Sequence, residues 1–176
     1  MRQGLLDGFP SDIPITVLVS GTAYYAHAAT QRSNLTVLSL AAVAAAMPAI
    51  ADTNIIVDGL GALAEPAAMM RDLLRATSGA RVFALVSNGA YGTDLLNFLA
   101  GDAFAGPHPL VAADLNALFA DTGWLAVERI PLIDRSVTHG PIPYTVSNRG
   151  VTLKVTTAEV AERLSTAGFV IIVDPQ

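Results

Sequence analysis

Residues 54–88 read NIIVDGLGALAEPAAMMRDLLRATSGARVFALVSN, and this stretch decides the fold class. It opens with a β-branched apolar run that stops at Asp58-Gly59, which predicts a buried strand. The segment from Ala80 to Asn88 predicts a second buried strand. A helical pattern lies between them, and strand, helix and strand at this spacing predict a parallel, right-handed βαβ unit.

The helix of this unit has recognisable start and stop signals. Pro66 is tolerated in the first turn of a helix, and Glu65 before it suits the positive end of the helix dipole. Gly79 stands where a glycine just past the last turn ends a helix. One face is apolar through residues three and four positions apart: Met70, Leu73, Leu74 and Thr77.

The segments on either side of this unit continue the pattern. Before it we expect an irregular lead-in at 1–14, a strand at 15–19, a turn at 20–22, a helix at 24–30, a strand at 35–40 and a helix at 41–47. After it we expect a helix at 93–99, a loop at 101–109, a helix at 114–122, a strand at 124–130, a loop at 135–143, a hairpin at 144–155 and a strand at 169–173. Thr156 and Glu159 predict a capping box for a final helix that ends at Gly168.

These elements predict a three-layer α/β sandwich with a mostly parallel sheet, in a single domain that spans residues 1–176. The strands expected to be parallel neighbours begin at Ile15, Leu35, Asn54 and Ala80. The strand at 124–130 and at least one later strand should extend the sheet beyond the Ala80 strand, and one of them should run antiparallel.

The composition excludes several classes of function. The formal net charge is -5, which argues against a surface that binds nucleic-acid phosphates. The absence of cysteine excludes disulfides, thiolate metal sites and cysteine nucleophiles, and it fits a reducing cytoplasm. The histidines are too widely spaced to predict a metal site: His27, His108 and His139. The uncharged segment 33–51 is interrupted by Asn34, Ser39 and Pro48, so we expect no membrane span.

Parts of the chain resemble a known family in order and spacing. The strand end Val57-Asp58-Gly59-Leu60-Gly61-Ala62-Leu63 and the pair Ser87-Asn88 occupy the places of its Asp-Val-Leu-Glu-His-Leu and Pro-Asn motifs. The loop around His108 and the segment 122–130 continue the pattern. Over roughly residues 15–130 the chain thus resembles class I S-adenosylmethionine (SAM) dependent methyltransferases, particularly those of surface-glycan synthesis. The resemblance implies a Rossmann-like fold and a SAM cofactor.

The resemblance also implies a cofactor site, formed by Gly21, Thr22, Ser39, Asp58, Gly59 and Asn88. After its first strand the family has an acidic residue and then Gly-x-Gly-x-Gly. This chain has Val19 at the acidic position, and Ala23 and Tyr25 at the later glycine positions. The family ends its second strand with an acidic residue that holds the ribose, whereas residues 37–41 contain no carboxylate. We therefore expect SAM to bind weakly or not at all.

Three of the candidate side chains have two interpretations each. Asp58 and Asn88 either contact a ligand at the carboxyl end of a parallel strand or serve as turn residues. His108 lies in the loop that approaches the methyl acceptor in the family. It is either a general base, which needs a partner within hydrogen-bond reach, or a solvated loop residue.

Two functions remain open at this stage. The first is a methyltransferase-like domain with a degenerate SAM site and a non-catalytic interaction or assembly role, which the missing glycines and acids favour. The second is an active SAM-dependent methyltransferase that acts on a sugar or another small-molecule acceptor. The apolar segment 41–50, with Val43, Met47 and Ile50, predicts a homodimer or a partner domain unless it covers its own sheet.

Overall fold

The computed structural model describes residues 2–21, 23–50, 54–77, 79–88, 92–101, 126–133, 141–148 and 150–174. Its helices are α1 (Arg2–Asp7), α2 (Ala23–Gln31), α3 (Leu40–Ala45), the 3-10 helix η1 (Leu60–Ala62), α4 (Pro66–Ala76), α5 (Gly92–Leu99) and α7 (Ala158–Ser165). Its strands are β1 (Ile15–Val19), β2 (Leu35–Ser39), β3 (Asn54–Asp58), β4 (Arg81–Ser87), β5 (Ala126–Ile133), β6 (Tyr144–Asn148), β7 (Val151–Val155) and β8 (Thr166–Val173). The predicted strand at 15–19 and the predicted hairpin at 144–155 are confirmed.

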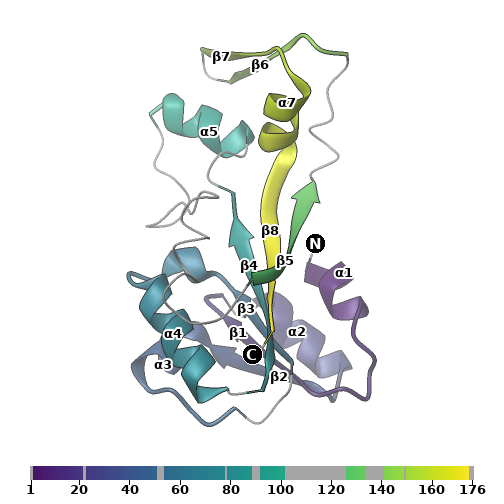
Figure 1. The fold of residues 1–176 in the computed structure, drawn as a ribbon, viewed down its shortest axis with the longest axis vertical. Helices are drawn as coiled ribbons and strands as arrows, with labels where there is room; N and C mark the ends of the chain where they lie inside the picture. Colours follow the sequence, from purple (N-terminus) through teal and green to yellow (C-terminus); the bar gives the residue numbers. More distant parts are fainter. Residues whose placement is uncertain are drawn as a thin grey trace.

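A six-stranded sheet with the order β2-β1-β3-β4-β8-β5 forms the centre of the fold (Figure 1). Strands β1 to β4 are parallel, and β8 runs antiparallel to both β4 and β5. The prediction of a mostly parallel sheet with an antiparallel strand beyond β4 is therefore confirmed. The register pairs Val19 with Asp58 and Asp58 with Leu85, so the carboxyl ends of β1, β3 and β4 lie side by side.

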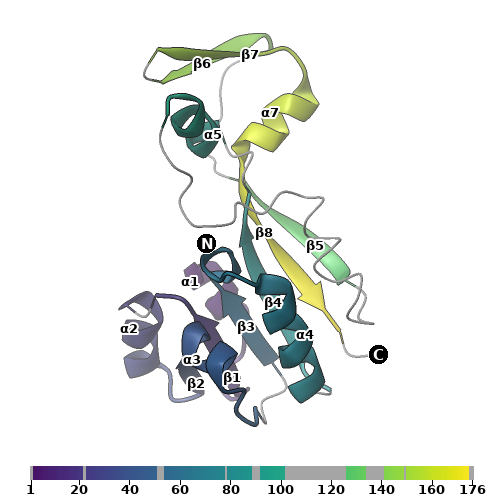
Figure 2. The same cartoon turned by 90° about the vertical axis from the view of Figure 1, so that its left-hand side faces the viewer.

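Helices cover both faces of this sheet and complete the predicted three layers. Figure 1 shows α3 and α4 on one side of the sheet and α1 and α2 on the other, and Figure 2 shows the same arrangement from the side. Successive residues of β1 point to opposite faces, so Leu18 packs in the cluster with α4 whereas Val17 and Val19 pack in the cluster with α1 and α2. Burial on both faces explains why β1 reads as a continuous apolar run.

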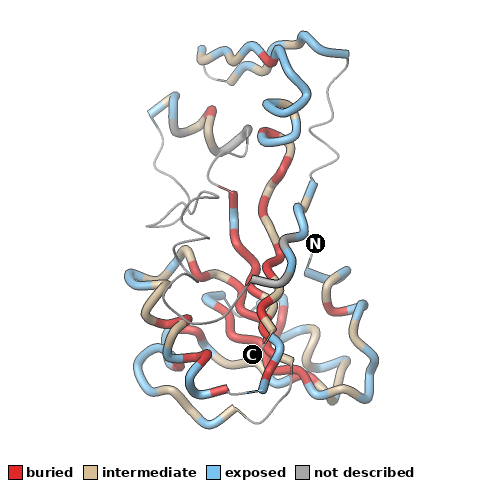
Figure 3. The backbone as a smooth tube through the Cα atoms, viewed as in Figure 1, coloured by how far each residue is buried: buried red, intermediate tan, exposed pale blue. Residues whose placement is uncertain are grey.

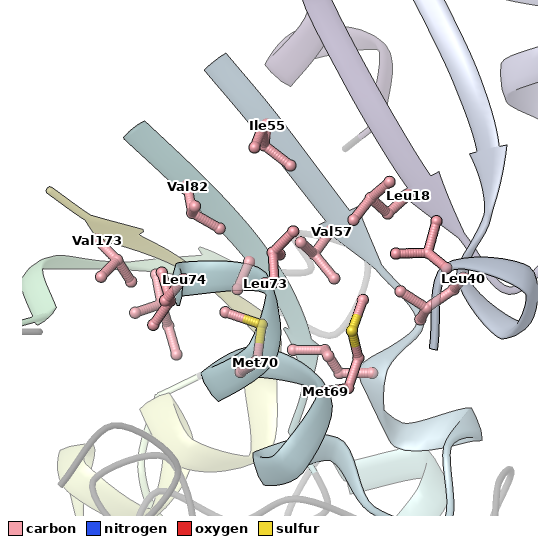
Figure 4. Packing of buried hydrophobic residues seen from close by; sticks show 14 of the residues in the cluster. Leu18, Leu40, Ile55, Val57, Met69, Met70, Leu73, Leu74, Val82 and Val173 are labelled. Atoms are coloured by element: carbon pink, nitrogen blue, oxygen red, sulfur yellow. The ribbon is translucent and has the colours of Figure 1, made fainter. Parts of the chain in front are cut away.

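Helix α4 lies on the sheet through the face that the sequence predicts. Its largest buried side chains are Met69, Met70, Leu73 and Leu74 (Figure 4). The face continues to Thr77, whose hydroxyl donates a hydrogen bond to the carbonyl oxygen of Leu73 at 2.7 Å. The helix ends before Thr77, and Gly79 follows with a φ of 98°, a conformation that favours glycine.

Helices α5 and α7 and the β6–β7 hairpin form a separate group beyond the carboxyl end of β4 (Figure 1). The side-chain amide of Asn148 donates to the amide oxygen of Asn97 at 2.6 Å, which links the hairpin to α5. Figure 3 shows buried residues concentrated in the sheet, whereas this group is mostly exposed or intermediate. The sheet and its covering helices therefore supply most of the core.

Two local predictions near helix starts are wrong. Residues 2–7 form α1 rather than an irregular lead-in, because Leu6 is buried against the sheet. The cap of the final helix is Thr157 rather than Thr156, and its hydroxyl accepts a hydrogen bond from the backbone N–H of Val160 at 3.3 Å. The expected capping box with Glu159 is replaced by a single cap.

The prediction that Gly168 ends the final helix is also wrong, because Gly168 lies inside β8. A Cβ at this position would stand 2.5 Å from the carbonyl oxygen of Val86 on β4. The two strand backbones thus approach too closely for a side chain, and this approach explains the glycine. The predicted helix at 114–122 lies outside the described residues.

The apolar segment 41–50 covers its own sheet. Val43 is buried, and Met47 and Ile50 are partly buried against the cluster that holds α4. Internal packing therefore accounts for these side chains, and they supply no exposed patch for a partner.

Candidate functional site

A cavity of about 590 Å³ lies at the carboxyl ends of β1, β3 and β4. Its walls include Ser20 and Gly21 after β1, Asp58 and Gly59 at the end of β3, and Ser87 at the end of β4. In open α/β sheets, ligands bind outside the carboxyl ends of the strands. The position of this cavity makes it the candidate functional site.

The turns after β1 and β3 are held against each other at the cavity wall. The backbone N–H of Ser20 donates to the carbonyl oxygen of Asp58 at 3.1 Å. Gly59 has a φ of 102°, and a Cβ there would stand 2.0 Å from the Ser20 hydroxyl oxygen. Gly21 differs, because a Cβ there would meet no atom within 4 Å. Glycine is thus structurally required at position 59, whereas Gly21 leaves open space beside the cavity.

The carboxylate of Asp58 is the centre of the polar contacts in the cavity. Asp58 is only 6% exposed. The Arg2 guanidinium of α1 donates to it from Nε at 2.5 Å and from Nη2 at 3.3 Å. The buried hydroxyl of Tyr25 on α2 donates to Oδ2 at 2.9 Å. Three elements far apart in sequence therefore meet at one carboxylate.

The environment shifts the pKa values of both partners in the direction that keeps these donors protonated. Burial raises the pKa of the Tyr25 hydroxyl well above its ordinary value, and the negative charge of Asp58 raises it further. The hydrogen bond to Asp58 raises the pKa of Arg2, and the proximity of the negative charge adds to this, although partial burial opposes it. At neutral pH the site thus holds a cationic guanidinium and a neutral phenol.

The structure brings together three of the six residues predicted for the cofactor site. Gly21, Asp58 and Gly59 line the cavity. Ser39 is exposed at the end of β2 and is not among the lining residues. Thr22 and the general-base candidate His108 lie outside the described residues.

Asn88 takes part in a structural contact rather than lining the cavity. Its side-chain amide donates to the carbonyl oxygens of Arg163 at 3.1 Å and Thr166 at 2.8 Å. Its backbone N–H donates to the carbonyl oxygen of Ala167 at 3.1 Å. These bonds join the end of β4 to the α7–β8 connection, so the contacts of Asn88 fit its interpretation as a structural residue.

Sequence reasoning missed Arg2 as a site residue and did not foresee the role of Tyr25. Arg2 lies in a segment predicted to be irregular, and 56 positions separate it from Asp58, so no local pattern indicated the contact. Tyr25 did carry a signal, because it occupies the third glycine position of the family turn. The sequence indicated crowding there, and the structure adds the hydrogen bond to Asp58.

The described residues include the positions at which the sequence departs from the family pattern. Val19 and Ser39 stand at the ends of β1 and β2, where the family has carboxylates. Tyr25 fills a position where the family has glycine, and Asp58 already accepts bonds from Arg2 and Tyr25.

Within the described ranges, no group of His, Asp and Glu residues could hold a metal ion. None of the helices described there is long and apolar enough to cross a membrane.

Comparisons with known proteins show the fold through structure alone. No family model matches the sequence, and no curated protein matches it. A SAM-dependent methyltransferase from Archaeoglobus fulgidus is similar with a TM-score of 0.62 at 11% identity, over 98% of this chain and 91% of the other. A chain from the complex between the Haloferax volcanii Trm112 methyltransferase activator and a methyltransferase is similar with a TM-score of 0.60 at 15% identity. The similarity covers 99% of this chain and 88% of the other.

A third similar structure is the S-adenosylmethionine-dependent methyltransferase from Mesorhizobium loti, with a TM-score of 0.54 at 14% identity, over 99% of this chain and 96% of the other. The chain therefore has a mixed α/β, Rossmann-like fold similar to that of these methyltransferase structures. Identities this low establish the architecture and leave the chemistry to the residues of the cavity.

Proposed function

We propose that this chain is a methyltransferase-like domain with an altered cofactor site and a non-catalytic binding role. The observation that carries the proposal is the position of Tyr25. It stands at a glycine position of the cofactor turn, its ring is buried, and its hydroxyl is bonded to Asp58 beside the cavity. A side chain in that place occupies space that the family keeps free for the close approach of SAM to the backbone.

The polar groups around the cavity support the same proposal. The family holds the ribose with an acidic residue at the end of its second strand, whereas β2 of this chain ends at Ser39, which carries no carboxylate and does not line the cavity. Asp58 is the one carboxylate among the described lining residues, and Arg2 and Tyr25 already bind it. The cavity nevertheless remains open enough for a small ligand. An active methyltransferase is the alternative that the following measurement would support.

SAM is expected to leave the melting temperature of this protein unchanged. A ligand present at a hundred times its dissociation constant stabilises the folded state by about 2.7 kcal/mol, which a thermal scan detects. The scan uses millimolar SAM and, separately, its demethylated product. A clear rise with either compound would overturn the altered-site proposal. In that case the Gly21→Ala variant tests whether SAM binds in this cavity. Gly21 lines the cavity and the added methyl group would meet no protein atom, so a smaller rise in the variant would place the ligand beside Gly21.

We also propose that the chain associates with itself or with a partner domain. Large apolar side chains are exposed on described residues of β5, α5, α7 and the segment before β6: Ile130, Ile133, Leu99, Val160 and Ile142. Such exposure on a chain with 14% charged residues favours association. Sedimentation at several micromolar concentrations should give a mass above that of the 18.3 kDa monomer. A monomer mass at every concentration would reject the homodimer.

A further inference from the structure

We propose that the cavity binds a small organic cation, an alkylammonium or alkylguanidinium group, which replaces the Arg2 guanidinium on Asp58. This inference rests on the proposed binding role and names the class of ligand. Arg2 is then an internal occupant of the site, and the ligand competes with it. The proposal is built from the burial of Asp58, the exposure of Arg2, the charges around the cavity and the space that remains in it.

The first step is the unequal burial of the two charged partners. The Asp58 side chain is 8% exposed, whereas the Arg2 side chain is 53% exposed. A buried carboxylate without a cationic partner is costly, because its lost hydration is not replaced. A half-exposed guanidinium recovers its hydration when it turns to water. Loss of the ion pair therefore costs more free energy at the Asp58 carboxylate than at the Arg2 guanidinium.

The second step is the charge of the cavity once Arg2 turns away. Arg2 and Asp58 are the charged residues among the described residues that line it. Without Arg2 the lining carries one negative charge, held in place by the Tyr25 hydroxyl. The Tyr24 ring also lines the cavity and packs edge-on against Tyr25, with centroids 5.1 Å apart. A carboxylate beside aromatic rings attracts an organic cation and repels an anion.

The third step is the freedom of Arg2 to leave. It stands at the start of a six-residue helix whose buried anchor is Leu6, more than one turn away. The guanidinium can therefore swing out while Leu6 keeps α1 on the sheet. Because the ligand binds only the fraction of molecules in which Arg2 has left, the apparent dissociation constant of the wild-type protein equals the intrinsic constant divided by that fraction, and is therefore higher.

The test measures binding of butylguanidinium and butylammonium, with butyrate and butanol as matched probes that lack the cation. Calorimetry is run on the wild type, Arg2→Gln, Asp58→Asn and Arg75→Gln, where Arg75 is an exposed arginine of α4 outside the cavity. Removing the competing guanidinium should tighten binding of both cations by roughly tenfold or more in Arg2→Gln, because the competent state becomes fully populated. Arg75→Gln should match the wild type. Butyrate and butanol should bind none of the proteins.

Asp58→Asn should lose cation binding, and its melting curve shows whether it remains folded. If it unfolds, amide NMR shifts in the Arg2→Gln protein replace it: butylguanidinium should shift Ser20 and Gly59, and should leave Gly79 unchanged. Equal cation affinity in the wild type and Arg2→Gln, or shifts away from the cavity, would overturn the proposal. A failure of the cation proposal is distinguishable from a failure of the proposed function, because the proposed function is tested separately by the thermal scan of the wild type with SAM.

Discussion

Gly59→Ala is expected to lower the free energy of unfolding by about 2–5 kcal/mol, from a strained backbone and a steric overlap. The φ of Gly59 is 102°, which an L side chain rarely adopts. The added Cβ would also stand 2.0 Å from the Oγ and 2.7 Å from the Cβ of Ser20. The hydroxyl can rotate away, but the Ser20 Cβ cannot move without the β1 turn. Denaturant unfolding measures the loss.

Gly79→Ala separates the two contributions to this effect. Gly79 has a similar φ of 98°, but a Cβ there would meet no atom within 4 Å. It should therefore show the backbone strain alone, about 1–2 kcal/mol. Equal losses in the two variants would show that the contact between the β1 and β3 turns does not constrain position 59.

Leu73→Ala is expected to destabilise the protein by about 2–5 kcal/mol, the usual range for a buried leucine truncated in a packed core. Leu73 is fully buried between α4 and the sheet, in the cluster that also holds Met70 and Val57 (Figure 4). The neighbouring strands cannot move in to fill the space, because their positions are fixed by the ladder of hydrogen bonds. Thermal and denaturant unfolding should agree on the loss.

Leu99→Ala provides the matched control for this truncation. Leu99 is the last residue of α5 and is 49% exposed. Exposed substitutions of this kind change stability by roughly 0.5 kcal/mol or less. A loss at Leu99 comparable to that at Leu73 would contradict the conclusion that the sheet and its covering helices hold most of the core.

These variants also separate the fold from the candidate site. Leu73 is not among the residues that line the cavity, so Leu73→Ala should weaken the fold without changing the ligand preference of the folded fraction. Gly59 lies at the cavity wall, so its substitution combines both effects. Arg2→Gln leaves the buried carboxylate of Asp58 without its cationic partner, so it should change both the stability of the fold and the competition for the site.

The sequence by itself determined the elements whose signals are local. The βαβ unit from Asn54 was predictable because a continuous apolar run indicates a strand buried on both faces. The apolar face of α4 was predictable because helical geometry places residues three and four positions apart together. The three-layer architecture follows from the alternation of such elements. The resemblance placed Tyr25 at a glycine position of a short contiguous turn, and the effect of this residue on SAM binding stays a prediction.

The tertiary structure decided the features that depend on contacts between distant residues. Helix α1 has no clear signal of its own, and it forms against a surface that β1 and α2 provide. The sequence predicts that Gly168 ends a helix. In the structure Gly168 lies in β8, between β4 and β5, and its backbone is close to Val86. The bond between Arg2 and Asp58 spans 56 positions, and neither residue alone indicates the other. The sequence could therefore place Asp58 at the end of a strand, but only the folded chain shows which groups satisfy its charge.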